Sequence, residues 1–166
     1  EIHENIFAVM DGTFAGDGAG PRAIDFKEKN IIMASYDQVA IDAISAKLMG
    51  FDPLSIPKLR IAHEKGLGIA NPREINIEGE QIKNINWNFS SNKNTFASRV
   101  QKYIYWGPLK PLEKILLRTP LVKLAYFASN FYHNSFWLRF IGKKRVRKAF
   151  ESNWGKLLME YKIIKP

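Results

Sequence analysis

The pattern of apolar and polar positions predicts two strands and a helix in the first part of the chain. Short apolar runs at residues 6–10 and 30–35 are bounded by turn-forming residues, which is typical of buried strands. A stretch that is apolar almost all round follows, through residue 49, and predicts a largely buried helix. Ser35 or Asp37 is the expected N-cap of this helix, and Gly50 is its expected end.

The pattern also divides the rest of the chain. A second helix is expected over residues 56–65, and alternation of polar and apolar residues at 74–79 predicts a half-exposed strand. Residues 1–80 therefore read as an α/β core unit with an incomplete β-β-α-α-β order. Residues 81–95 are polar and rich in asparagine, and we interpret them as a connector. Residues 96–166 predict a helical, aromatic and basic extension.

Composition narrows the class of protein. The chain has 166 residues, of which 46% are hydrophobic, and this fits one small domain with an appendage. It has no cysteine, which excludes disulfides, zinc ribbons and an iron–sulfur cluster held within this piece. The chain begins at Glu1 and offers only three expected strands. We therefore expect an upstream, N-terminal half of the same protein as a partner of this piece.

Charge is distributed unevenly along the chain. Residues 1–95 carry 10 Lys/Arg and 13 Asp/Glu, a net charge of −3, whereas residues 96–166 carry 15 Lys/Arg and 3 Asp/Glu, a net charge of +12. Such asymmetry often marks contact with an acidic surface, a nucleic acid or an anionic membrane. The expected location is cytoplasmic, with peripheral contact to a membrane as an extension of that expectation.

The segment after the first expected strand is the leading candidate site. A buried strand followed by acids and glycines is the order in which α/β proteins place ligands. Glycines leave backbone N–H groups open to an anion, and carboxylates ligate a hard divalent cation or act as general bases. The candidate anion-binding glycines are Gly12, Gly16, Gly18 and Gly20, and the candidate metal ligands and catalytic carboxylates are Asp11 and Asp17.

Two common phosphate-binding patterns are absent from this segment. No helix is expected directly after the glycines, so the dinucleotide fingerprint is not met, and no Gly-Lys-Ser/Thr follows them, so the Walker loop is not met either. The alternative interpretation is a tight turn that needs glycine for its shape alone.

Other polar residues are weaker candidates. Asp37 either only caps the expected helix or, with Ser35, contacts a ligand. His63 on the second helix is either an ordinary surface or core histidine or a proton-transfer group. Each of these residue types has a structural use that needs no ligand, so the sequence leaves both alternatives open.

Asp42 lies among apolar residues of the first helix. A buried carboxylate must be paired or protonated, so this residue is a candidate for proton transfer. Gln38, Asp42 and Ser45 are spaced to form one polar stripe on the helix, and the stripe faces either a site or water.

The C-terminal extension contains a long aromatic stretch at residues 121–141, followed by a basic run at 143–148. One interpretation is binding to an anionic membrane surface, with aromatic rings in the interface and cations on the headgroups. Polar and charged residues interrupt the stretch too often for a transmembrane span. Nucleic-acid binding is a second and less favoured interpretation. The third is a helical subdomain that packs on the rest of the protein.

Four motifs and a C-terminal pattern suggest a family. The motifs are Asp11-Gly12 with residues 16–21, residues 31–43, residues 47–53 and residues 62–68, and the pattern is Trp154-Gly155 followed by Tyr161. In this order they resemble the C-terminal half of domain-of-unknown-function family 362. The resemblance implies an upstream half with its own Lys- and His-containing motif. Relatives often carry a four-iron–four-sulfur ferredoxin module, which the lack of cysteine excludes from this piece.

Two functional hypotheses follow. The first is an enzyme or cofactor-handling domain that binds a small anionic ligand, with a divalent metal as the candidate cofactor, at the glycine-rich acidic segment. The second is a non-catalytic interaction protein that docks on a membrane surface or a partner through its basic, aromatic C-terminal segment. The resemblance leaves the reaction open, because the activity of the family is not established.

Overall fold

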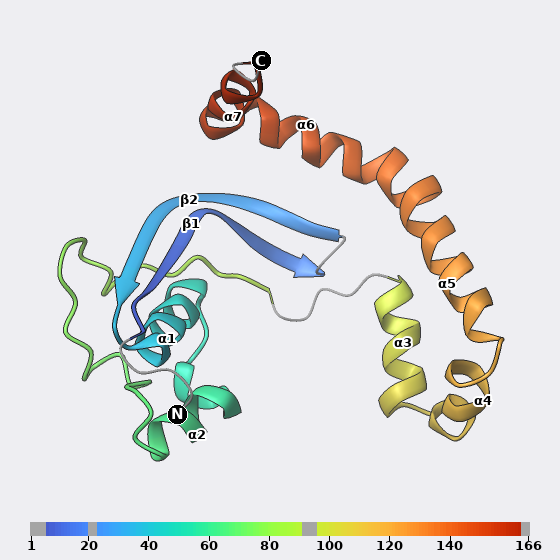
Figure 1. The fold of residues 1–166 in the computed structure, drawn as a ribbon, viewed down its shortest axis with the longest axis horizontal. Coiled ribbons are helices and arrows are strands. Elements are labelled where there is room, and N and C mark those ends of the chain that lie inside the picture. Colours follow the sequence, from blue (N-terminus) through green and yellow to red (C-terminus); the bar gives the residue numbers. More distant parts are fainter. Residues whose placement is uncertain (1–5, 20–22, 91–95, 164–166) are drawn as a thin grey trace. The chain divides into compact units, whose positions relative to one another are not determined.

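The computed structural model describes residues 6–19, 23–90 and 96–163. Contacts between residues divide the chain into two compact units. The first unit contains residues 1–15 and 28–89, and the second contains residues 16–27 and 90–166. Figure 1 shows the elements, and each unit is considered by itself below.

A β-hairpin opens the chain. Strand β1 (Ala8–Ala19) pairs with strand β2 (Ala23–Ser35) in a two-stranded antiparallel sheet. Helix α1 (Gln38–Met49), a 3₁₀ turn η1 (Pro53–Ser55) and helix α2 (Pro57–Glu64) follow. The α/β class, the buried first helix and the second helix are therefore confirmed.

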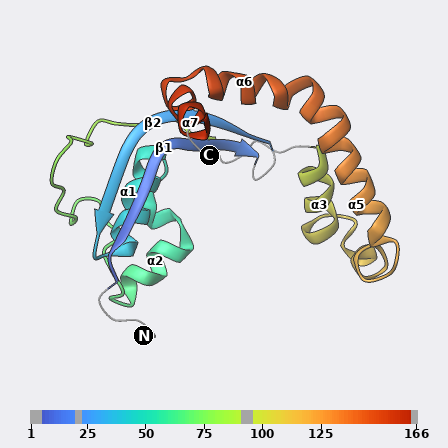
Figure 2. The same cartoon turned by 45° about the horizontal axis from the view of Figure 1, so that its top comes forward.

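The core of the first unit forms on two sides of α1. One cluster joins Ala43 and Ala46 of α1 to Leu59 of α2 and to Ala70. Figure 1 and Figure 2 both show α1 lying along the hairpin. Because α1 is apolar almost all round, it can bury one side against α2 and another against the strands.

A second cluster covers the other side of α1. Ile44 and Leu48 pack with Ile82, while Ile31 and Met33 of β2 lie against this group. The segment expected as a polar connector also packs here. Its backbone binds the C-terminal end of α1: Trp87 N donates to Leu48 O (2.8 Å) and Phe89 N donates to Met49 O (2.9 Å).

Two expectations about the strands are wrong. Residues 11–19 do not form a glycine-rich turn but continue β1, and Gly20 lies outside the described residues. The strand expected at 74–79 is absent, and these residues have irregular backbone. Ile75 packs against both core clusters, whereas Ile77 is exposed, so the alternating apolar residues do not form one buried face. A short alternating pattern is therefore not enough to establish a hydrogen-bonded strand.

The second unit is helical apart from the end of the hairpin, which confirms the helical C-terminal extension. It contains α3 (Phe96–Trp106), the 3₁₀ turn η2 (Lys110–Leu112), α4 (Glu113–Leu117), α5 (Val122–Phe131), η3 (Tyr132–Gly142), α6 (Lys143–Glu151) and α7 (Asn153–Ile163).

Three of these elements join without a break. The junction residues Phe131 (φ −60°, ψ −49°) and Lys143 (φ −57°, ψ −38°) keep helical backbone angles, so α5, η3 and α6 form one helical rod, residues 122–151. The rod is seen in orange in Figure 1. Its middle section, η3, is a π-helix of 11 residues.

Candidate functional site

Asp11 is exposed on β1 and is held by its own strand. Its Oδ1 accepts a hydrogen bond from the backbone N–H of Thr13 at 2.8 Å. The Thr13 hydroxyl, and then the Thr13 N–H, lower the pKa of the Asp11 carboxyl below its ordinary value. Asp11 is therefore an ionised surface carboxylate that accepts hydrogen bonds from Thr13.

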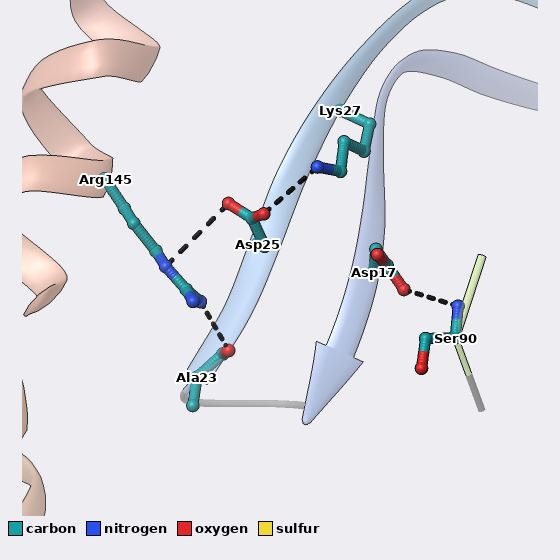
Figure 3. A network of polar contacts seen from close by, with 6 residues as sticks. All are labelled: Asp17, Ala23, Asp25, Lys27, Ser90 and Arg145. Carbon is teal, nitrogen blue, oxygen red and sulfur yellow. Dashed lines mark hydrogen bonds and ion pairs between the residues drawn. The ribbon is translucent and has the colours of Figure 1, made fainter. Parts of the chain in front are cut away.

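Asp17 has a different environment. Its side chain is buried, with 5% of the residue exposed, and its Oδ1 accepts a hydrogen bond from Ser90 N at 2.8 Å. Figure 3 shows this bond, which ties the strand to the chain that enters the second unit. Six residues separate Asp17 from Asp11 along β1, or about 20 Å at the rise of a strand. Asp11 belongs to the first unit and Asp17 to the second, so the two expected metal ligands lie in different units.

The glycines of β1 serve the hairpin. A Cβ atom on Gly12 would collide with the Ile31 side chain of the facing strand and would lie 3.2 Å from its carbonyl oxygen. Gly18 adopts φ 92°, a backbone conformation that other residues rarely adopt. Gly16 lies in the same strand. Close strand approach and local twist thus account for these glycines, in place of the expected turn.

Asp37, one of the two residues expected as the N-cap of the first helix, is the N-cap of α1. Its Oδ1 accepts from Ala40 N (2.9 Å) and its Oδ2 accepts from Ile69 N (2.7 Å). The Asp37 N–H in turn donates to Ser35 Oγ at 2.9 Å. Both carboxylate oxygens are therefore used to hold the start of α1 and the loop after α2.

Asp42 and the neighbouring polar residues of α1 do not form one stripe. Asp42 faces water and pairs with Lys58 of α2 (Oδ2 to Nζ, 2.7 Å). Ser45 is buried and donates to Ile41 O (2.7 Å). Gln38 donates to the carbonyls of Ile6 and Tyr36, each at 2.9 Å. The three side chains thus have separate structural partners, and Asp42 is a surface carboxylate.

His63 lies half-buried on α2, where its Nδ1 accepts a hydrogen bond from Ala70 N at 3.4 Å. This contact fastens the loop that follows the helix. Within the described residues, no group of three or more His, Asp or Glu side chains is placed to hold a metal ion. The candidate acids and His63 therefore lie in separate local networks.

The helical rod presents a different kind of surface. Four phenylalanines along it, which we call the aromatic face, leave much of their area in water: Phe127 (70%), Phe131 (60%), Phe136 (53%) and Phe140 (58%). Their rings form two contacting pairs, with Phe127 stacked on Phe131 (centroids 6.4 Å apart) and Phe136 beside Phe140 (5.2 Å). Exposed apolar side chains of this size mark interaction sites when they are contiguous.

Positive charge accompanies the aromatic face. Residues 114–150 contain nine Lys/Arg and no Asp or Glu. Within the part of the chain that the structure describes, Lys143, Lys144, Arg147 and Lys148 are exposed and form no ion pair, and we call these four residues the basic cluster. Unpaired cations beside exposed aromatic rings fit a negatively charged partner.

Arg145, in the same run, is bound to other residues of the chain. Its Nη1 donates to Ala23 O at 2.8 Å, and its Nε lies 3.8 Å from Asp25 Oδ1. Lys27 approaches the other oxygen of Asp25 at 3.1 Å, as Figure 3 shows. The sequence offered no local signal for this network, because the two partners are 122 residues apart.

The length and hydropathy of the helices bear on the expected contact with a membrane. None of the helices in the described ranges is both long enough and apolar enough to cross a bilayer.

Comparison with known proteins gives one weak similarity. No family model matches the chain, and no solved structure matches it significantly. A thylakoid-associated protein of Synechocystis sp. is 25% identical over 87 residues, which cover 47% of this chain. The matched part spans only 27% of that protein. The resemblance to domain-of-unknown-function family 362 remains a prediction.

Proposed function

We propose that this chain is a peripheral membrane-binding module that docks on an anionic lipid surface through its helical rod. The observation that carries the proposal is the exposure of four phenylalanines beside four unpaired cations on one helix. Amphipathic helices of this composition lie in the membrane interface, with rings among the upper acyl chains and cations at the headgroups.

The energies support binding of useful strength. Full burial of a Phe side chain contributes roughly 1.5–3 kcal/mol, and each Lys or Arg near an anionic surface contributes about 1 kcal/mol. Four half-exposed rings and four cations therefore give a gross gain of several kcal/mol. The gain is divided between an apolar part and a charge part, so the two can be measured separately.

The weak relative agrees with this proposal. The Synechocystis protein is named for its association with thylakoids, which are membranes. The similarity covers a minority of both chains, so it supports a membrane setting and says nothing of a reaction.

A nucleic acid would bind the same cations, but it would leave much of the exposed apolar area of the second unit in water. Further large apolar side chains are exposed along the rod and in α7, among them Leu124, Ile141 and Leu158. Aliphatic side chains offer no stacking platform to bases, whereas a bilayer covers aliphatic and aromatic side chains alike.

The enzyme hypothesis stays a prediction with less support. A small anionic ligand and a divalent metal at Asp11 and Asp17 would need the two carboxylates to converge. They lie in different units, six positions apart on β1, and Asp17 is buried and accepts a hydrogen bond from Ser90 N. The geometry of the described residues thus favours the interaction hypothesis.

The test removes the rings while keeping the charge. The full chain and a variant carrying Phe127→Ser, Phe131→Ser, Phe136→Ser and Phe140→Ser are sedimented with phosphatidylcholine–phosphatidylglycerol vesicles. The matched control replaces four exposed apolar residues outside the rod: Val100→Ser, Tyr103→Ser, Leu109→Ser and Leu112→Ser. Binding that is lost only in the rod variant supports the proposal. Equal binding by all three chains, or no binding by the native chain, contradicts it.

A further inference from the structure

The helical rod contains an unusual middle section. A π-helix is normally a single turn inserted in an α-helix, often at a functional site, whereas η3 extends over 11 residues, Tyr132–Gly142. It separates two halves of the proposed membrane surface. Phe127 and Phe131 precede it, in α5, and the basic cluster follows it, in α6.

The π-helix changes the direction in which later residues face. An α-helix turns by about 100° per residue, and a π-helix, which bonds each N–H to the fifth preceding carbonyl, turns by about 80°. Over the length of η3 the difference accumulates to about 200°, which is more than half a turn. The side chains of α6 therefore face nearly opposite to the direction that an unbroken α-helix would give them.

Burial within the rod agrees with this rotation. His133 and Gly142 are the two buried residues among those described in η3, and they are nine positions apart. An α-helix would place them on opposite sides, about 180° apart. The wider turn of the π-helix brings them to within about 20° of one another. Both then lie on the side of the rod that turns away from water.

The ring contacts within η3 join residues four apart, which an α-helix also brings together, so the effect of η3 appears in the longer spacing from Phe127 to Phe140. Tyr132 stacks on Phe136 (centroids 6.0 Å apart), and Phe136 lies beside Phe140 at 5.2 Å. In an unbroken α-helix Phe140 would face about 140° away from Phe127. With η3 between them, the two residues face within about 60° of one another.

We propose that η3 sets the phase of the helical rod, so that Phe127, Phe131, Phe136 and Phe140 share one lipid-facing side with Lys144, Arg147 and Lys148. This inference rests on the proposed membrane function and adds the orientation of the bound rod. The apolar and cationic halves of the surface act together because the π-helix aligns them.

A single-cysteine scan tests the orientation, because the chain has no cysteine of its own. Spin labels are placed one at a time at Phe127, Phe131, Phe136 and Phe140, and their exposure to oxygen and to a water-soluble nickel complex is measured on anionic vesicles. Labels at the exposed residues Tyr126 and Leu138 are the controls, since the same helical rotation directs both away from the aromatic side.

Four lipid-facing labels and two water-facing controls are the expected result. A different result would overturn the inference and leave the proposed function standing: lipid around the labels at Phe127 and Phe131, but water around those at Phe136 and Phe140. That result would show an unbroken α-helix. A chain that leaves all labels in water overturns both.

A pair of length variants tests the phase independently. Because each residue of a π-helix turns less, the 11 residues of η3 rotate the chain about as far as nine α-helical residues would. A variant that lacks Asn134 and Ser135 and forms an unbroken α-helix should therefore keep the native alignment of α6. Its vesicle affinity should change by less than about threefold. Inserting two alanines after Gly142 in that variant restores the native length but rotates α6 by about 200°, and affinity should fall about tenfold or more. Equal affinities of the two variants would overturn the inference.

Discussion

Arg145 donates a hydrogen bond to the carbonyl of Ala23 at 2.8 Å, and this contact joins α6 to the start of β2 within the second unit. Asp25 lies 3.8 Å from the same guanidinium, and Lys27 lies on the other side of Asp25. Arg145 also lies over the ring of Trp137, 5.7 Å from its centroid. One member of the basic run is thus structural, while the basic cluster around it remains exposed.

Replacing Arg145 should therefore weaken the fold more than replacing its neighbour. Arg145→Met loses a backbone hydrogen bond that contributes about 1 kcal/mol and a half-exposed ion pair that contributes little. The exposed Arg147→Met should change stability by less than about 0.5 kcal/mol. Thermal unfolding of both variants measures the difference. Equal melting temperatures would mean that the Arg145 contacts do not hold α6 in solution.

Asp37 should matter more for stability than any other candidate acid of the first unit. Asp37→Ala removes the N-cap of α1 and the acceptor of the Ile69 N–H, and we expect a loss of about 2 kcal/mol. Asp42→Asn breaks only an exposed pair with Lys58 and should cost less than about 0.5 kcal/mol. Urea unfolding compares the two variants. A larger loss in Asp42→Asn would contradict the assignment of Asp37 as the cap.

Gly12 should be coupled to Ile31 across the hairpin. Gly12→Ala places a methyl group against the Ile31 side chain, and such overpacking costs about 1–3 kcal/mol. Ile31→Ala removes the atom that collides, so the double variant should be more stable than the sum of the two single losses implies, by about 1 kcal/mol. A double-mutant cycle in urea measures this coupling. Strict additivity would show that Gly12 is required for another reason.

Asp11 should contribute a pH-dependent stability at low pH. Its pKa in the folded chain is lowered from the ordinary value of 3.8, first by the Thr13 hydroxyl and then by the Thr13 N–H. A carboxyl with a lowered folded pKa stabilises the fold fully above its unfolded pKa, and this stability is lost as the pH falls through the folded pKa.

The pKa of Asp11 can be measured by NMR titration of its carboxyl carbon. Thr13→Val removes the hydroxyl and should move the pKa of Asp11 upward, toward 3.8. Thr13→Ser keeps a hydroxyl and should leave the pKa near that of the native chain. A Thr13→Val variant with an unchanged Asp11 pKa would show that the hydroxyl does not bind this carboxylate.

The elements that local sequence specifies were predictable. Asp37 and Gly50 mark the two ends of α1, and both act through backbone groups within a few residues. The hairpin was misjudged because glycine signals a turn and a close strand approach equally well. At Gly12 the second use applies, and it depends on Ile31 of the other strand.

The surface of the rod was predictable in kind but not in arrangement. The aromatic stretch and the basic run are visible in the sequence, whereas the contact of Arg145 with Ala23 depends on residues that are far apart in the chain. The phase set by η3 was missed because the expected helical period assumes α-helical turns throughout. Asp42 was misjudged because its neighbours on α1 are buried, whereas Asp42 itself forms an ion pair with Lys58 of α2 at the surface.

The most direct measurement is vesicle co-sedimentation of the full chain at two salt concentrations. Phosphatidylcholine vesicles with phosphatidylglycerol should bind the chain, and binding should weaken between about 0.1 M and 1 M salt, as the Debye length falls from about 10 Å to about 3 Å. A variant with Lys143→Gln, Lys144→Gln, Arg147→Gln and Lys148→Gln should bind at least tenfold more weakly, since each cation contributes about 1 kcal/mol. Lys102→Gln, Lys110→Gln, Lys114→Gln and Arg118→Gln together are the matched control, which should bind nearly as the native chain does. Two results would contradict docking through the rod: binding that does not depend on lipid charge or salt, and binding that falls equally in both variants.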